Sequence, residues 1–206
     1  KDAVTWAEAH ARIITWAEAH ATCAVSSHSD VPSMPDLKQI SKRSIPTALE
    51  KALRYRLLNE PVEAESICRD VLAVDPGNLE ALRTLLLAIT DQFATEFHTA
   101  LAGTQEVLKQ FTGQYEREYY GGIVYERWGK AQCAARMPNH VVAGWIRQAM
   151  RCYEQAEAVS TSDDPDPMLR WNACVRFLQR YEVAAPESRA TQHDAEPDDT
   201  DEVPRA

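Results

Sequence analysis

Apolar residues that recur every three to four positions, in short stretches bounded by strong helix breakers, dominate the middle of this chain. Between Val62 and Val74, for example, the apolar side chains fall at the period of an amphipathic helix. The four residues from Asp75 to Asn78 then combine Pro and Gly with an Asn that can cap a following helix. No window alternates apolar and polar residues for long enough to predict a strand. We therefore expect an all-α fold.

Several stretches of this kind follow one another, and Gly, Pro, Asn or Asp separates each from the next. Period and breakers together predict helices over residues 46–58, 62–74, 79–93, 96–111, 115–135, 141–159 and 167–181. Helices this short cannot bury an apolar face alone, so neighbouring helices must pack against one another.

The two ends of the chain differ in composition from this helical part. The heptapeptide Thr-Trp-Ala-Glu-Ala-His-Ala occurs twice near the start, in a stretch rich in helix-favouring Ala and Glu. Ser and Pro then interrupt the pattern, whereas the last residues are acidic and nearly free of large apolar side chains. The predicted organisation is an N-terminal helix over 1–22, a linker over 23–44, a helical domain over 45–181 and a disordered acidic tail over 182–206.

Residue spacing within the helical domain resembles the tetratricopeptide repeat (TPR) family. The second helix of that repeat and its exit turn are matched by Ala64, Cys68, Val71, Leu72, Asp75 and Pro76. Ala52 and Tyr55 match the first helix, in which a small residue lets the second helix cross closely. The resemblance implies antiparallel helix pairs stacked as a right-handed superhelical solenoid, with about three repeats and a capping helix.

In that family the first helix of each pair lines a concave groove that binds peptides. Carried onto this chain, the resemblance implies a groove formed by Leu49, Leu53, Arg56, Arg83, Leu87, Tyr119, Ile123, Arg127, Trp171 and Val175. Tyr, Trp and Arg are also the residues that most often anchor protein interfaces. The resemblance therefore points to a protein-binding surface.

The sequence shows no pattern typical of catalysis. The His residues stand apart from any nucleophile or carboxylate pair, and no catalytic motif or zinc-ligand spacing occurs. Five widely spaced Cys are typical of buried thiols in a reducing compartment. We therefore expect a cytoplasmic protein that is not an enzyme, with no catalytic residue, no metal and no cofactor.

Charge and hydropathy narrow the range of partners. A net charge of -9 argues against nucleic acid as the main partner, and no stretch approaches the roughly 18–20 apolar residues of a membrane span. A protein or peptide partner remains. Two functions stay open: an adaptor that binds its partner in the groove, and a structural subunit that forms a homo-oligomer through repeat edges and the N-terminal helix.

Overall fold

The computed structural model describes residues 34–95 and 97–184. Two compact units divide the chain between Lys38 and Gln39, and every described helix belongs to the second unit. The predicted N-terminal helix, most of the predicted linker and nearly all of the predicted acidic tail lie outside the described residues. The described fold therefore consists of the helices of the second unit.

Within the described ranges all regular secondary structure is helical, and no strand occurs. The elements are η1 (Lys42–Ser44), α2 (Ile45–Leu57), α3 (Pro61–Val74), α4 (Leu79–Asp91), α5 (Phe97–Leu108), α6 (Gln114–Ala134), α7 (Asn139–Val159) and α8 (Asp166–Ala184). The all-α prediction is confirmed. Each predicted helix corresponds to an observed one, with ends that differ by at most three residues.

Local chemistry sets the helix ends. Asn59 adopts a left-handed φ of 62° after α2, and Pro61 then occupies the first turn of α3, where its missing N–H costs nothing. Asn78 caps α4, because its Oδ1 accepts a hydrogen bond from the backbone N–H of Ala81 at 2.9 Å. Between α6 and α7 the chain turns through Arg136, which has a left-handed φ of 57°. The breakers seen in the sequence are thus the turns of the structure.

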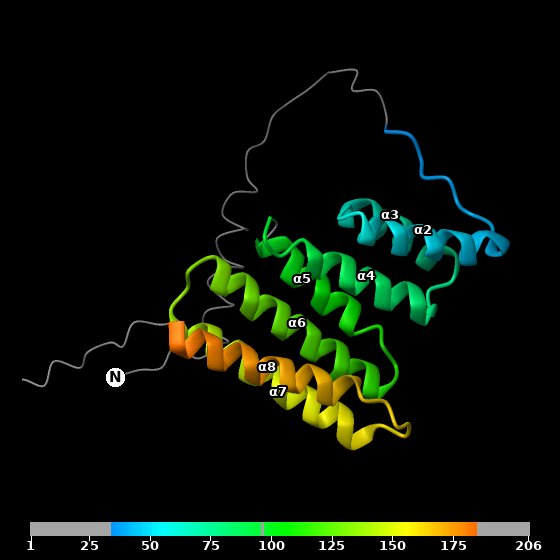
Figure 1. Cartoon of the computed structure of the whole chain (residues 1–206). Helices are drawn as coiled ribbons and strands as arrows, with labels where there is room; N and C mark the ends of the chain where they lie inside the picture. Colours follow the sequence, from blue (N-terminus) through cyan, green and yellow to red (C-terminus); the bar gives the residue numbers. More distant parts are fainter. Residues whose placement is uncertain (1–33, 96, 185–206) are drawn as a thin grey trace, which may run out of the picture. The chain divides into compact units, whose positions relative to one another are not determined.

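Each helix of this unit packs against the next one along the chain (Figure 1). In addition, α4 contacts both α2 and α6, so the first helix of each successive pair touches the first helix of the next. The pair α6 and α7 shares the largest contact in the unit. The helices therefore form a sequential stack in which α2, α4 and α6 are neighbours.

Two apolar clusters hold the stack together, and α6 belongs to both. The first cluster gathers around α4 and reaches α6, where the edge of Phe93 meets the ring of Trp128 at 5.2 Å between centroids. The second cluster joins α6, α7 and α8 around Tyr153, whose side chain is fully buried. Because α6 contributes to both clusters, it couples the two halves of the stack.

Glycine allows α6 and α7 to approach closely. A Cβ added to Gly122 would lie 2.5 Å from the ring of Tyr153, and one added to Gly129 would lie 2.9 Å from Ile146. Contacts this short do not occur between real side chains, so both positions need glycine. The two glycines are seven residues apart, which places them on the same side of α6. A seam of glycines thus defines the crossing of this pair.

The last residues of the predicted linker belong to the folded unit. Ile40 packs against a small cluster made by Leu49, Val71 and Ala81. The 3₁₀ turn η1 follows and leads directly into α2. The apolar side chain of Ile40 therefore anchors the entry of the chain to the first helix pair.

Candidate functional site

The most distinctive arrangement on the surface is a carboxylate that joins three helices. Asp91, at the end of α4, accepts a hydrogen bond from Nε of Arg56 on α2 at 2.9 Å. Its other oxygen accepts a hydrogen bond from Arg127 on α6. The side chains of these three residues are only 15–25% exposed. We call Arg56, Asp91 and Arg127 the charged triad.

Arg127 is held by more than the carboxylate. Its Nη1 also donates to Oγ1 of Thr90 at 2.8 Å and to the carbonyl oxygen of Leu87 at 3.3 Å. Hydrogen bonds that involve a charged group are roughly twice as strong as neutral ones, and the partial burial of the triad protects them from screening. The two guanidinium groups and one carboxylate leave the triad with a net positive charge. It can therefore attract a carboxylate of a partner.

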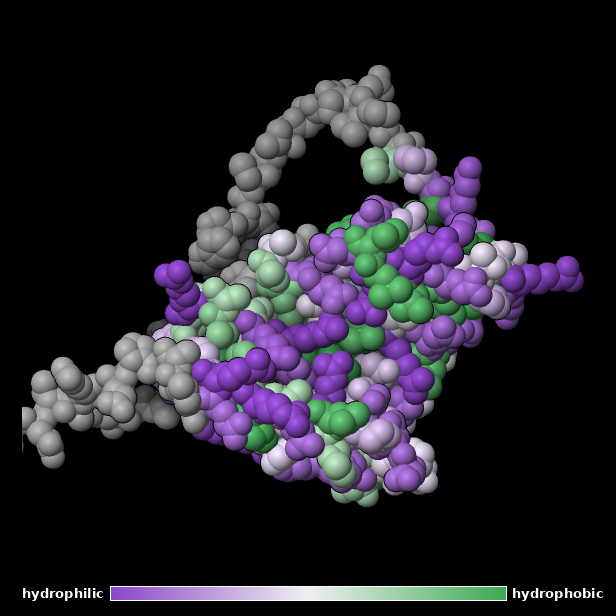
Figure 2. Space-filling view, viewed as in Figure 1, coloured by the Kyte–Doolittle hydropathy of each residue, from purple (hydrophilic) through white to green (hydrophobic). Residues whose placement is uncertain are grey.

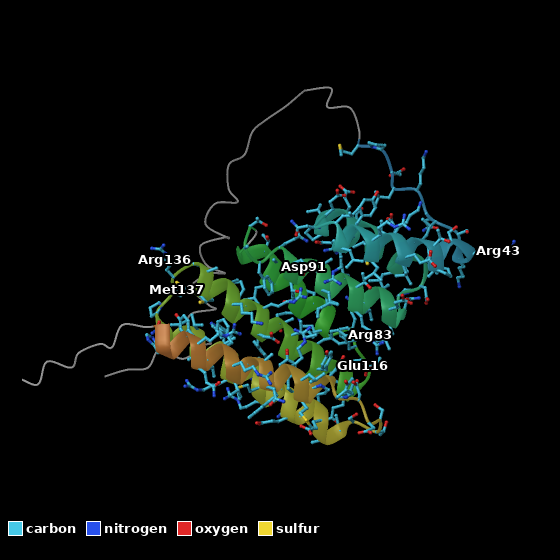
Figure 3. The ribbon with its side chains drawn as sticks, in the orientation of Figure 1. Arg43, Arg83, Asp91, Glu116, Arg136 and Met137 are labelled. Carbon is cyan, nitrogen blue, oxygen red and sulfur yellow. The ribbon has the colours of Figure 1, made fainter. Side chains whose placement is uncertain are left out.

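A second ion pair lies further along α4. Nη2 of Arg83 donates to Glu116 of α6 at 3.0 Å, and the guanidinium carbon lies 5.9 Å from the ring centre of Tyr120. Figure 3 shows Arg83 of α4 next to Glu116 of α6, with Asp91 further along α4. Burial raises the pKa of Tyr120, although the nearby Arg83 acts in the opposite direction. Arg83, Leu87 and Asp91 are spaced four residues apart, which explains why one side of α4 carries both ion pairs.

An exposed apolar strip borders the charged triad on α2. The side chain of Leu53 is 49% exposed and that of Leu57, one turn further, is 80% exposed. Figure 2 shows hydrophobic residues on the surface over this part of the stack, beside strongly hydrophilic ones. Leu53 lies three residues before Arg56 and four before Leu57, so it neighbours both side chains on the surface of α2. A partner that reaches the triad therefore also meets this strip.

The structure divides the residues of the predicted groove into three groups. Arg56, Leu87 and Arg127 come together at the charged triad, with Leu53 beside it, and Arg83 forms the second ion pair. Leu49, Tyr119 and Ile123 are instead buried, so their side chains lie below the surface. Trp171 and Val175 of α8 are half-buried and remote from the triad in sequence; the indole N–H of Trp171 donates to Glu154 at 2.9 Å.

Tyr119 is buried because α8 covers it. Its hydroxyl donates to Asp166, the first residue of α8, at 3.3 Å. Burial, and then the charge of Asp166, raise the pKa of this phenol. A helix periodicity can assign Tyr119 to one side of α6, but it does not show that α8 packs there. The sequence did not indicate the acidic residues Asp91 and Glu116 as part of the site. Each carries the opposite charge to the arginine it pairs with and lies 33 to 36 residues from it along the chain.

A second polar cluster lies between α6, α7 and α8. The carboxylate of Glu126 is 1% exposed and accepts hydrogen bonds from the Tyr153 hydroxyl at 2.7 Å, from Arg170 at 3.5 Å and from Lys130. Burial, and then the charge of Glu126, raise the pKa of Tyr153 far above its usual range. Each carboxylate oxygen has a donor from the protein itself. This cluster therefore satisfies a buried charge and ties the three helices together.

Three of the four described cysteines behave as small apolar side chains. Cys68, Cys152 and Cys174 are buried, and burial raises the pKa of these thiols to about 12, about 11 and about 12. A neutral buried thiol is a poor nucleophile. Among the residues that the structure describes, no group of His, Cys, Asp and Glu side chains is arranged to hold a metal ion. In the same part of the chain, no helix has both the length and the apolar character to cross a bilayer.

The geometry thus offers one surface on which charged and apolar groups from several helices meet, at α2, α4 and α6. Comparison of the chain with protein-family models, with curated proteins and with solved structures finds no match.

Proposed function

We propose that this protein is a non-enzymatic interaction module that binds a peptide or an extended segment of a partner protein across α2, α4 and α6. The observation that carries the proposal is the charged triad beside the exposed strip of Leu53 and Leu57. Exposed apolar side chains mark interaction surfaces, and arginine is enriched among the residues that dominate binding energy at protein interfaces.

The proposal includes a TPR-like stacking of the helices as a right-handed solenoid. Two observations support it: α4 contacts both α2 and α6, and small residues lie where paired helices cross. Ala52 has no exposed surface and packs in the same cluster as Ala64 and Cys68 of α3. In such a stack the first helices form one continuous surface, which suits a long, narrow ligand.

The charge and the exposed apolar side chains of this surface indicate which chemical groups a partner presents. The triad carries a net positive charge, and the neighbouring strip of α2 is apolar. A segment with a hydrophobic side chain close to an Asp, a Glu or a terminal carboxylate satisfies both groups. The arginines are already oriented by Asp91, so a carboxylate meets donors that lose little conformational freedom on binding.

Selection of peptides from a random library tests this function with defined ligands. The full chain is used as bait, and the double variant Leu53→Asp with Leu57→Asp removes peptides that bind elsewhere. Both leucines are exposed, so the double variant should keep its fold, which circular dichroism checks. We expect enriched peptides to combine a hydrophobic and an acidic residue.

Binding of an enriched peptide is then measured by fluorescence anisotropy. We expect Leu57→Asp to weaken binding at least tenfold, which corresponds to about 1.4 kcal/mol, because an apolar contact is replaced by a charge. Leu169→Asp on α8 is the matched control, since Leu169 is similarly exposed on a helix outside the site. The proposal is wrong if no peptide is enriched over the double variant, or if both substitutions weaken binding equally.

A further inference from the structure

The outer side of the first helix pair is a second surface that the proposed function does not use. Here α2 and α3 border an open hollow of about 650 Å³. Ile40, Ala48, Tyr55 and Ile67 form its apolar floor. Ala48 and Tyr55 lie on a different side of α2 from Leu53 and Leu57, because the helical period separates them by more than a quarter turn. The hollow and the charged triad are therefore distinct surfaces.

Charges of opposite sign line the two walls of the hollow. Arg43 and Lys51 stand on the wall formed by η1 and α2, whereas Glu63 and Asp70 stand on the wall formed by α3. Figure 3 shows Arg43 in η1, just before the start of α2. Within the described residues, none of these four side chains forms an ion pair or a side-chain hydrogen bond. The hollow thus has one basic and one acidic wall, both unpaired.

Such a surface is complementary to itself. A two-fold axis that runs along the helix pair would place α2 of one copy opposite α3 of the other, with the basic wall of each facing the acidic wall of its mate. Lys51 and Asp70 lie at distances from the turn between α2 and α3 that differ by about 5 Å along the helix axes. A lysine side chain can span this difference. A two-fold axis across the helices would instead set the basic wall of one copy against the basic wall of the other, and like charges would repel.

We propose that this protein forms a homodimer through the outer face of α2 and α3, with α2 of each copy packed on α3 of the other. The apolar floors of the two hollows meet at the centre, and Lys51 and Asp70 pair at the rim. The proposal does not rest on the peptide-binding function, because the hollow and the peptide-binding surface have no residue in common.

The area of the outer α2–α3 face limits how much surface each copy can bury in this dimer. A pair of 13- and 14-residue helices presents a face about 20 Å long and about 20 Å wide, or roughly 400 Å². Stable complexes bury about 800 Å² on each partner. The face is about half that size, so we expect a weak dimer, with a dissociation constant in the micromolar range, that is populated at high protein concentration.

Charge reversal tests the pairing directly. The full chain is studied by sedimentation equilibrium from about 5 μM to about 500 μM, a range that brackets a micromolar dissociation constant. Lys51→Glu and Asp70→Lys each put like charges across the interface, so we expect each variant to dimerise at least tenfold more weakly. Lys109→Glu is the control, because Lys109 lies at the end of α5, and its exposed pair with Glu106 contributes little to stability.

Mixing the two reversed variants provides the decisive measurement. In a mixed dimer the introduced acidic group faces the introduced basic group, while the unaltered Lys51 and Asp70 face each other, so both contacts return. We expect association of the mixture to recover to the level of the original protein. Circular dichroism confirms that each variant is folded. The proposal is overturned if the original protein stays monomeric over the whole range, or if the mixture associates no better than either variant alone.

Discussion

The α2–α3 pair and the α6–α7 pair lie on either side of α4 and α5, and their helices pack together in different ways. The α2–α3 pair consists of short helices, uses alanine at its crossing, and leaves leucines and a charged hollow exposed. The α6–α7 pair has 21 residues in each helix, uses glycine at its crossing, and buries Glu126 and Tyr153 between them. The first pair leaves apolar and charged side chains exposed, whereas the second buries such groups between its helices.

The physical reason is the number of sides on which each pair is covered. The α6–α7 pair is packed against α8 on one side and against α4 and α5 on the other, so it can bury polar groups only with complete hydrogen bonding. The α2–α3 pair is packed on one side alone by the described helices, mainly against α4. Packing by the described helices therefore places little constraint on the identity of its outer residues.

The strongest test of this contrast is Gly122→Val. The added Cβ would lie 2.5 Å from the ring of Tyr153, which is fully buried and cannot move aside. We expect the free energy of unfolding to fall by about 3 kcal/mol, as measured by chemical denaturation.

Gly121→Ala is the matched control for this change. No atom lies within 4 Å of a Cβ at Gly121, and alanine favours helix by up to about 1 kcal/mol over glycine. We therefore expect equal or higher stability for Gly121→Ala. Similar losses at both positions would mean that helix propensity, and not the glycine seam, determines how α6 packs.

The corresponding change in the first pair is Ala52→Leu. Ala52 has no exposed surface and packs against α3, so a larger side chain overfills the crossing. We expect a loss of about 2 kcal/mol, less than for Gly122→Val, because α3 can shift toward its open side. Thermal and chemical denaturation measure the effect.

Ala73→Leu on the exposed side of α3 is the control, and its stability should be nearly unchanged. A loss at Ala52 as large as that at Gly122 would show that the first pair is as tightly constrained as the second. The comparison between the two pairs would then have to be abandoned.

The smallest expected effect concerns the charged triad. Asp91→Asn keeps the shape of the side chain but removes the charge that holds Arg56 and Arg127 together. Because the triad is partly exposed, we expect a loss of only about 1 kcal/mol in the free energy of unfolding.

Glu106→Gln serves as the control for the triad, since it breaks an ion pair with Lys109 that is far more exposed, at 70% and 69%. We expect about 0.3 kcal/mol or less there. If the two changes have equal effects, the triad contributes no more than an ordinary surface pair. Peptide binding across α2, α4 and α6 would then lack a preorganised set of donors.

Local features of the sequence were sufficient to predict the helices. Breakers such as Pro61 and Asn78 act within one turn, through a missing N–H or a capping side chain, and their effect does not depend on distant residues. The resemblance to the TPR family likewise implies a small residue at Ala52, and Ala52 is fully buried against α3.

The candidate site was only partly predictable. The TPR resemblance assigns Arg56, Arg83, Leu87 and Arg127 to the groove, and all four take part in the contacts among α2, α4 and α6. Their acidic partners were not identified, because Asp91 is 35 residues from Arg56 and 36 from Arg127 along the chain. Periodicity assigns a residue to one side of its own helix and carries no information on what faces it.

The sequence alone determined where the described helices begin and end to within three residues, because capping, proline and glycine act on the nearest turns. Only the tertiary structure decided which helix faces are covered. Tyr119 and Ile123 have the spacing of surface residues of α6, yet both are buried, Tyr119 beneath the start of α8. Leu53 has an equally apolar pattern and stays exposed, because no described helix covers that side of α2. Burial depends on the neighbours that the fold brings together, and those neighbours are far apart in the sequence.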